Sequence, residues 1–201
     1  MIAHPGQPMV GGRKALRVVV VVVALFGATR VVRADDPSVP LQLQVDLSAK
    51  MLEYVQEPPV MSFDRVRIGI VVKPGSPEST RAGAELKVAF DRVGTIGGRA
   101  HEQSIVVWSG AAPLIEHARR GALIVLYFTP GLDAEVQVVA RALDGQRLMT
   151  IAAVDSYVQD GVILGFELVS GHPKMILNLA QSKRQGVVLR AAVLKLVRIV
   201  K

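Results

Sequence analysis

The sequence predicts an α/β fold: a single three-layer domain with a mostly parallel sheet flanked by helices, and with a β-hairpin and an amphipathic helix at its carboxyl end. Two kinds of segment, which alternate along the chain, predict it. Short apolar runs rich in β-branched residues, such as RVRIGIVV at 65–72 and ALIVLYF at 122–128, alternate with segments whose apolar residues recur at helical spacing. Strands joined through helices pair in parallel, and a parallel sheet is covered on both faces.

Residues 1–34 have the pattern of a secretory signal peptide. Basic residues precede an uninterrupted apolar run at 18–28, and Ala34 precedes the polar segment DDPSVP. This run is shorter than the about 20 residues that a membrane-spanning helix needs, so a retained anchor is the weaker alternative. We therefore expect cleavage after Ala34, a periplasmic protein, and a mature domain at 35–201.

The charge balance of the mature chain argues against nucleic acid as a partner. The whole chain has a formal net charge of +7, but five of its 24 basic residues and none of its 17 acidic residues precede Asp35. The mature chain keeps 19 basic and 17 acidic residues, a net charge of +2. Nucleic-acid binding normally needs a dense cationic face. Since the chain has no cysteine, disulfides and thiolate zinc sites are excluded as well.

The first half of the domain is predicted to be a helix, a strand and a second helix. Apolar residues at alternating steps of four and three predict a helix at 41–55, ended by Pro58 and Pro59. Its inward residues are Leu41, Val45, Leu52 and Val55. The strand at 65–72 follows. Ser76 can then cap the second helix, because its hydroxyl accepts a free backbone N–H while the next proline presets the first turn; Gly94 can close that helix.

The alternation then repeats. The expected elements are a short strand at 104–108, a helix at 109–121 with a glycine stop, a strand at 122–128, a helix at 132–143 and a strand at 147–154. After Asp155 the rhythm changes. The runs VILGFELV (162–169) and KMILNL (174–179) are separated by the turn residues Ser170 to Pro173, which predicts a hairpin with a four-residue connection.

The basic segment ILNLAQSKRQG is interpreted as a short helix rather than as a ligand-binding loop. Asn178 stands at the N-cap, Gln181 lies three residues on as in a capping box, and Gly186 can end the helix in a left-handed conformation. Lys183 and Arg184 lie in the last turn, where positive charges interact favourably with the helix dipole. A final helix with one apolar face is expected to pack on the sheet; that face is Leu189, Val193, Leu196, Val197 and Val200.

Polar residues follow four of the predicted parallel strands. They are Ser76, Ser109, Thr129 and Asp155. Ligands of open α/β sheets bind beyond the carboxyl ends of the strands, where helix N-termini can hold a small anionic ligand. These four residues are therefore candidate ligand-binding residues. The alternative is that Ser, Thr and Asp are the residue types that begin helices in any such fold.

No catalytic motif occurs in the chain. The four histidines, at positions 4, 101, 117 and 172, have no metal-ligand spacing, and there is no GxSxG elbow, P-loop or GxGxxG after a strand. We therefore expect neither a metal nor a cofactor, and no enzymatic activity.

The segments GSPES, YFTPGLDAEV and above all GFELVSGHPKMILNLAQSKRQGVVLRAAVLKLVRIV resemble the YfiR-like family of periplasmic proteins. The features that match are a hairpin, an Asn-Leu step, a basic short helix with glycine, and a terminal amphipathic helix; the residues are Gly165, Phe166, Asn178, Leu179, Gly186, Leu194 and Leu196. The resemblance extends from about Val45 to Val200. It implies an exported α/β protein that represses a membrane-bound diguanylate cyclase through the periplasmic domain of that enzyme, and so lowers cyclic-di-GMP and biofilm output. Redox control through disulfides, which belongs to the family picture, is impossible without cysteine.

These observations lead to one main functional hypothesis and one alternative. The main hypothesis is a regulatory interaction module that binds a membrane signalling protein, either a diguanylate cyclase or a sensor kinase, and that can form a homodimer. The alternative is a small-solute-binding protein that serves a transporter or sensor through the crevice at the strand ends.

Overall fold

The computed structural model describes residues 36–57 and 63–200. The predicted signal peptide and the proline pair expected to end the first helix lie outside the described residues. The helices are α1 (Leu41–Leu52), α2 (Pro77–Asp91), α3 (Ala111–Arg120), α4 (Val136–Ala142), α5 (Ser156–Gln159) and α6 (Leu179–Gln185), with the 3₁₀ helix η2 (Ala191–Lys195). The strands are β1 (Val55–Glu57), β2 (Arg65–Val72), β3 (Ala100–Val107), β4 (Val125–Phe128), β5 (Met149–Ala152), β6 (Leu164–Val169), β7 (His172–Asn178), β8 (Val188–Leu189) and β9 (Val197–Val200).

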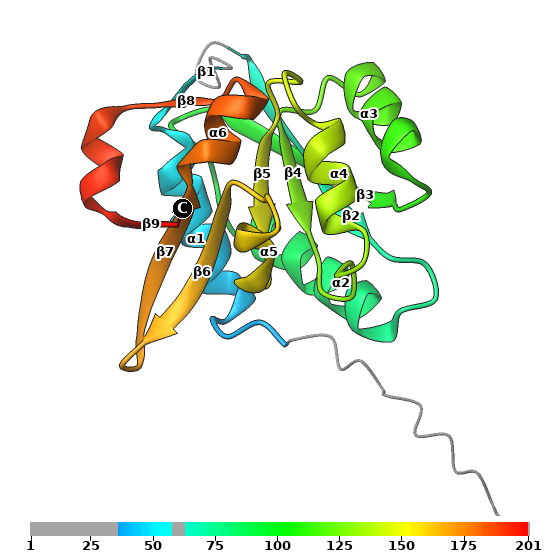
Figure 1. The fold of residues 1–201 in the computed structure, drawn as a ribbon, viewed down its shortest axis with the longest axis horizontal. Coiled ribbons are helices and arrows are strands. Elements are labelled where there is room, and N and C mark those ends of the chain that lie inside the picture. The colour runs from blue at the N-terminus through cyan, green and yellow to red at the C-terminus, as the bar shows by residue number, and fades with distance from the viewer. Residues whose placement is uncertain (1–35, 58–62, 201) are drawn as a thin grey trace, which may run out of the picture. The chain divides into compact units, whose positions relative to one another are not determined.

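The main sheet of the described chain has seven strands in the order β3-β2-β4-β5-β6-β7-β9. Strands β2 to β6 run in parallel, β7 returns antiparallel to β6, and β9 pairs with β7 in parallel. Figure 1 shows helices on both sides of this sheet. The predicted α/β class, with a mostly parallel sheet between helical layers, is confirmed. A separate two-stranded sheet pairs β1 with β8.

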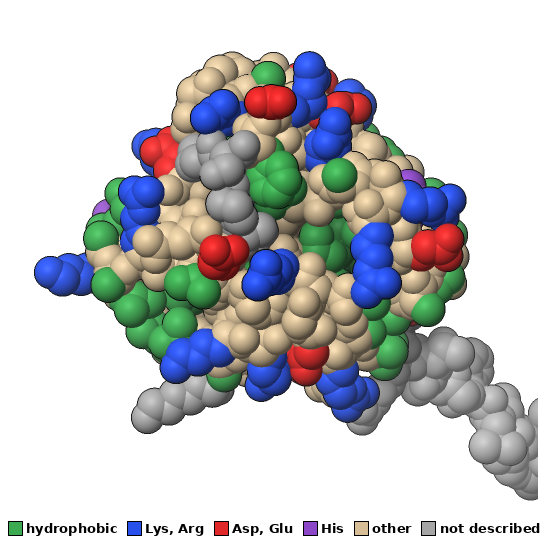
Figure 2. Space-filling view, turned by 90° about the horizontal axis from the view of Figure 1, so that it is seen from above, with side chains coloured by type: hydrophobic (Ala, Val, Ile, Leu, Met, Phe, Trp, Pro, Cys, Tyr) green, Lys and Arg blue, Asp and Glu red, His purple; other side chains and the backbone are tan. Residues whose placement is uncertain are grey.

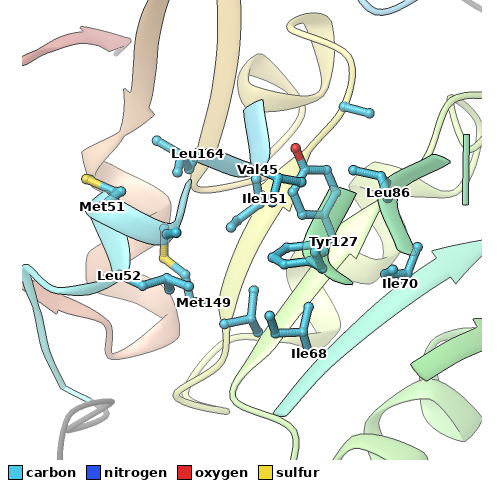
Figure 3. Packing of buried hydrophobic residues seen from close by; sticks show 14 of the residues in the cluster. Val45, Met51, Leu52, Ile68, Ile70, Leu86, Tyr127, Met149, Ile151 and Leu164 are labelled. Atoms are coloured by element: carbon cyan, nitrogen blue, oxygen red, sulfur yellow. The ribbon is translucent and has the colours of Figure 1, made fainter. Parts of the chain in front are cut away.

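The larger core lies between the sheet and helices α1 and α2. Tyr127 of β4 stands in it, and its ring meets Phe90 of α2 edge to face, with the ring centroids 6.1 Å apart. Figure 3 shows Tyr127 surrounded by aliphatic side chains from α1, α2 and the neighbouring strands. Each large apolar side chain buried in this way contributes roughly 1.5–3 kcal/mol. The opposite face of the sheet packs against α3 and α4, with Leu114 and Val139 among the buried residues.

One buried glutamine fastens α1 to the sheet. The Gln44 amide donates to the carbonyls of Val39, at 2.8 Å, and of Ala153, at 3.1 Å. Its Oε1 accepts the Tyr127 hydroxyl at 2.8 Å. Burial raises the pKa of Tyr127 far above its ordinary value, so the phenol stays neutral as a donor. The side-chain polar groups of Gln44 and Tyr127 are thus paired, as most buried polar groups are.

Helix α2 begins as its sequence predicts. The Ser76 hydroxyl accepts the Ser79 backbone N–H at 3.2 Å, and Pro77 is the first helical residue. The helix ends at Asp91, with Arg92 as its C-cap rather than the expected Gly94. Because Arg92 keeps a right-handed helical conformation, no left-handed glycine is needed at this end.

Several predicted boundaries differ from the structure: α4 begins at Val136 rather than at 132, β4 at Val125 rather than at 122, and β5 covers Met149–Ala152 rather than 147–154. Val55 belongs to β1, where it pairs with Leu189, instead of extending α1. Strand β3 begins at Ala100, because its whole length pairs in register with β2. The hairpin is confirmed, but its turn has two residues, Ser170 and Gly171, because His172 already pairs with Val169. Both turn residues have positive φ, which is the twist that tight hairpins favour.

The predicted final helix is wrong. Residues 189–200 form the end of β8, the 3₁₀ helix η2 and strand β9. The segment Val197–Val200 pairs in parallel with Met175–Asn178 of β7, so it extends the sheet instead of covering it. Its sequence, VRIV, fits a strand as well as a helix turn, and β-branched residues favour strands when an edge is available.

The predicted short helix α6 is confirmed at both ends. The Asn178 Oδ1 accepts the Gln181 backbone N–H at 2.8 Å, and Gly186 ends the helix in a left-handed conformation. The reciprocal bond of a capping box is absent from this helix: the Gln181 amide donates to the Ala140 carbonyl, while the Asn178 backbone N–H donates to Ile163. Gln181 therefore joins α6 to α4 rather than closing the cap.

Candidate functional site

The four predicted site residues follow the carboxyl ends of β2, β3, β4 and β5, which meet at one edge of the sheet because these strands are parallel. We call this edge the carboxyl edge. Ser76 and Thr129 follow β2 and β4, which are neighbours. Ser109 and Asp155 follow β3 and β5, which are separated by two strands. With strands about 4.8 Å apart, these last two positions are roughly 14 Å from each other.

A chain of hydrogen bonds occupies the crevice between β2 and β4. The Lys73 backbone N–H donates to the Ser79 hydroxyl at 2.7 Å. The Ser79 and Thr129 hydroxyl oxygens are 2.6 Å apart, and the Thr129 hydroxyl donates to the Val71 carbonyl at 2.7 Å. Since Thr129 gives its proton to that carbonyl, Ser79 is the donor between the two hydroxyls. Thr129 is fully buried and has no proton left for a ligand.

The loops beside this chain are fastened to each other. Ser76 donates to the Glu78 carboxylate at 2.9 Å, which lowers the pKa of Glu78 after the larger effect of a backbone hydrogen bond. The loop after β4 packs on Ser76: a Cβ placed on Gly131 would lie 3.0 Å from the Ser76 hydroxyl oxygen. An ion pair at 3.0 Å joins Lys73 to Glu135. The crevice at this position is filled by side chains and loops of the protein itself.

The outer two predicted residues have different surroundings. Ser109 is exposed and Asp155 is half-buried. Asp155 stands at the N-cap of α5 without a side-chain capping bond. The carboxyl edge thus holds two occupied hydroxyls at its centre and two more accessible polar groups at its sides. Ligand binding by these four residues remains a prediction.

Within residues 36–57 and 63–200, no group of three or more His, Asp or Glu side chains is placed to hold a metal ion. In the same residues, no helix has both the length and the apolar character that a membrane span requires.

An exposed apolar surface lies on the carboxyl-terminal strands. Leu168 pairs with Pro173, Met175 pairs with Val197, and residues two apart on a strand share a face. Five residues therefore form one row, which we call the apolar stripe: Leu168, Pro173, Met175, Val197 and Ile199. Leu168 and Ile199 are 47% and 42% exposed. Met175 and Val197, which lie between them, are partly buried and pack against the core beneath α1.

The stripe borders the free edge of the sheet and a strong ion pair. Among the described strands, β9 is paired on one side only, with β7. On the other face of these strands, Arg198 binds both oxygens of Glu167 at 2.5 and 2.6 Å. That bond raises the pKa of Arg198. Sequence reasoning missed the stripe because it assigned Val197 to the inward face of a helix; the β-branched run VRIV was the signal that could have revealed it.

The protein is therefore a small α/β domain, and the part of it that the structure describes exposes the apolar stripe at one edge of the sheet. The chain belongs to the YfiR/HmsC-like family, whose profile matches residues 42–198, more than half of the chain. Membership supports a periplasmic and regulatory role in general, and it confirms the resemblance seen in the sequence. No curated protein matches the chain.

Two solved structures have a similar fold. A conserved domain protein from Vibrio cholerae O1 biovar El Tor is 16% identical, with a TM-score of 0.55 over 83% of this chain and 62% of that one. The ABC domain from Streptococcus pneumoniae, solved in complex with L-Trp, is 12% identical, with a TM-score of 0.55 over 80% of this chain and 62% of that one. This chain therefore spans less than two thirds of either structure. At such identities the likeness concerns the fold alone.

Proposed function

We propose that this protein is a periplasmic module that binds the periplasmic domain of a membrane signalling protein, a diguanylate cyclase or a sensor kinase, and regulates its output. The apolar stripe is the observation that carries the proposal. Exposed apolar rows of this kind mark interaction sites more often than isolated surface residues do. The family to which the chain belongs supports the regulatory role.

The stripe has the composition expected of an interface core. Leu168 and Ile199 supply exposed apolar area, and the Glu167–Arg198 ion pair lies on the opposite face of the same strands. In protein interfaces, a few buried apolar anchors carry most of the binding energy, while exposed charge pairs around them contribute little and mainly set orientation. The free outer edge of β9 can add backbone hydrogen bonds to a partner strand.

The mechanism is a shift of the partner between two states. A binding protein can move such an equilibrium only by its difference in affinity for the two states. The module therefore needs no catalytic group of its own. It inhibits if the stripe fits the inactive form of the partner better than the active form.

The test places a charge on the stripe. In Ile199→Glu and Leu168→Glu, binding of the periplasmic domain of a cyclase or kinase encoded beside this protein should weaken about tenfold or more, as for the loss of an interface anchor. Repression in a cellular cyclic-di-GMP assay should be lost in parallel. Val138→Glu is the matched control, because Val138 is 50% exposed on α4, across the sheet from the stripe.

Equal binding by all three variants would contradict this interface. The solute-binding alternative makes a different prediction at the carboxyl edge, where Ser109 and Asp155 are accessible. A ligand-induced thermal shift that is lost in Asp155→Ala and kept in Ile199→Glu would favour that alternative. Thr129 is unsuitable for this test, because a bulky residue at its fully buried position would destabilise the fold as well as block the crevice.

Export is part of the same proposal. We expect the mature amino terminus at or within a few residues of Asp35, as the pattern of residues 1–34 predicts. Mass spectrometry of the protein isolated from a bacterial periplasm measures this directly. Recovery of the uncleaved chain in the membrane fraction would contradict the localisation.

A further inference from the structure

A second surface feature lies at the opposite edge of the sheet, where β4 and β5 begin. A pocket of about 240 Å³ opens there between the end of α3 and the loop before β5. Its described lining residues are Phe63, Ala118, Arg119, Ala122, Leu123, Ile124, Gln146, Arg147 and Leu148. Figure 2 looks onto this edge and shows hydrophobic side chains in a hollow near the middle of the face, with Lys and Arg side chains beside it. We call this feature the arginine-rimmed pocket.

The floor and the rim of this pocket differ in chemistry. Its buried residues, Ala118, Ile124 and Leu148, are all apolar. Phe63 forms part of the wall and is 38% exposed. The charged side chains among the described lining residues are arginines, at the exposed rim, and none of those lining residues is acidic. The pocket is therefore apolar at its base and cationic at its mouth.

One rim arginine is held in place without neutralising its charge. Arg119 donates through Nε and Nη2 to the Gln146 side-chain oxygen, at 3.2 and 2.7 Å. A neutral amide orients the guanidinium but leaves its charge and the Nη1 donors available. Arg119 appears in no ion pair of the described residues. Such an oriented cation loses little entropy when a carboxylate binds it.

Two residues of the lining have strained backbones. Ala122 has φ 48° and Arg147 has φ 56°, in the left-handed region that favours glycine. The Arg147 backbone N–H donates to the Gln185 carbonyl at 2.8 Å, so α6 holds this residue in place. This conformation is unfavourable for a residue with a Cβ. Strain that the surroundings maintain occurs preferentially at functional sites.

The size and polarity of the pocket fit one side chain of a protein better than a free small molecule. Pockets for small molecules usually measure about 300–1,000 Å³ and contain a few buried polar groups that fix the ligand. This pocket is smaller, and its buried floor is entirely apolar. An aromatic or large aliphatic side chain fills such a floor as an interface anchor. Carboxylates on either side of that anchor would meet Arg119 and Arg147.

We propose that the arginine-rimmed pocket binds an acidic segment of a partner protein, with one aromatic side chain in the pocket and carboxylates on the two arginines. This site is distinct from the apolar stripe, and the proposal holds whichever signalling protein the stripe engages. It gives the protein a second contact, at the edge of the sheet where β4 and β5 begin.

The probe is a short synthetic peptide with a central phenylalanine between aspartates and glutamates, titrated into the mature protein and followed by NMR. We expect saturable binding at millimolar peptide or below, with the largest shifts around Phe63 and Leu148. Replacing the peptide phenylalanine by alanine should weaken binding about tenfold, the effect of losing an anchor. Added salt should also weaken binding, because the rim charges are exposed.

Variants of the protein locate the site. Arg119→Gln with Arg147→Gln should weaken binding about fivefold, because exposed charge pairs contribute modestly. Arg120→Gln is the matched control: Arg120 is the next cation on α3, does not line the pocket, and pairs with Glu116 at 3.5 Å. It should leave binding unchanged. All three residues are exposed, so the variants should fold.

Several outcomes would overturn the proposal. These are the absence of saturable binding, equal binding of a basic peptide of the same length, and equal weakening by the control variant. Binding of free phenylalanine as tight as that of the peptide would replace the proposed protein segment by a small molecule. None of these results depends on repression of a cyclase, so failure here leaves the test of the apolar stripe unaffected.

Discussion

The two edges of the sheet use their polar groups in opposite ways. At the carboxyl edge, a chain of hydrogen bonds runs from the Lys73 backbone N–H through the Ser79 and Thr129 hydroxyls to the Val71 carbonyl, and it uses the donors of the central crevice. At the amino edge, where β4 and β5 begin, an apolar pocket stays open beneath exposed arginines. The edge at which this class of fold usually binds ligands is closed at its centre between β2 and β4, whereas the amino edge holds an apolar pocket.

This difference shows that fold class alone does not locate a site. The crevice rule identifies where free backbone groups and loops converge, but whether they remain available depends on the residues that follow each strand. A serine on α2 and a threonine after β4 are enough to close the crevice here. The four predictions below test how firmly each edge is built.

The largest effect is expected at the amino edge, from Asn178→Ala. The Asn178 side chain caps α6 and also donates to the buried Val158 carbonyl at 2.8 Å. Losing a cap costs about 1 kcal/mol, and losing the second hydrogen bond adds about 0.5–1.5 kcal/mol, because the Val158 carbonyl keeps the Gly161 backbone N–H at 3.4 Å. We expect urea denaturation to show a loss of about 1.5–2.5 kcal/mol, with partner binding intact in the folded fraction. A variant of unchanged stability that no longer binds would assign Asn178 to a binding site instead.

The second prediction tests the closed crevice. Thr129→Val keeps the shape of the side chain but removes the hydroxyl that joins Ser79 to the Val71 carbonyl. The buried Ser79 hydroxyl then has no acceptor for its proton, while the Val71 carbonyl keeps the backbone N–H of residue 129 at 3.2 Å, so the change should cost about 1–2 kcal/mol in the free energy of unfolding. Ser109→Ala is the control at the same edge, because Ser109 is exposed, and its effect should stay within about 0.5 kcal/mol. Equal effects of both changes would show that the hydroxyl chain does not close the crevice.

Most of the fold could be predicted because its signals are local. Ser76 before a proline marks the start of α2, and Asn178 with Gly186 brackets α6, so these ends follow from residues close in sequence. The alternation of apolar runs gives the parallel sheet. Strand β9 could not be predicted in this way, because VRIV becomes a strand only through its pairing with Met175–Asn178, a contact distant in sequence.

The surfaces were harder to predict than the core. The predicted site residues lie at one edge, but the sequence does not show that Thr129 gives its proton to a carbonyl 58 positions away. The arginine-rimmed pocket combines Phe63, Arg119 and Arg147 from three separate segments. No spacing rule joins them, since only the folded chain brings the end of α3 beside the loop before β5.

The third prediction concerns pH at the carboxyl edge. The Tyr157 hydroxyl accepts the Leu132 backbone N–H at 2.8 Å and so fixes the loop after β4. Burial, with a smaller effect from Asp133, raises the pKa of Tyr157 above its usual value. Because the folded pKa is the higher one, the stability from this phenol is complete below pH about 10 and falls as the pH rises further.

Tyr157→Phe separates the two contributions of this side chain. At neutral pH the variant should lose about 1 kcal/mol, since the Leu132 N–H loses its acceptor. Above pH about 10 its urea midpoint should decline less steeply than that of the parent protein. The decline that remains belongs to Tyr127, whose pKa is also raised by burial. Parallel declines of the two proteins would mean that Tyr157 does not resist ionisation.

The smallest expected effect, a gain, comes from the strained wall of the arginine-rimmed pocket. Helix α3 ends in a motif in which the Leu123 N–H donates to the Ala118 carbonyl and the Ala122 N–H to the Arg119 carbonyl. Glycine usually occupies the left-handed position of this motif. Here Gly121 stands one residue too early, with φ −78°, and Ala122 takes the left-handed conformation. The predicted glycine stop is confirmed, since Gly121 is the C-cap of this helix, but the left-handed residue is the next one, Ala122.

Ala122→Gly should relieve this strain and stabilise the protein by about 0.5–1 kcal/mol, after allowing for the extra freedom of glycine in the unfolded chain. Gly121→Ala is the matched change: a Cβ there would lie 3.2 Å from the His117 carbonyl oxygen, so no gain is expected. Thermal unfolding of both variants measures the difference. If Ala122→Gly is more stable yet binds the acidic peptide less well, the strain orders the pocket wall for binding. If binding is unchanged, the strain belongs to the helix end alone, and the arginines carry the recognition without it.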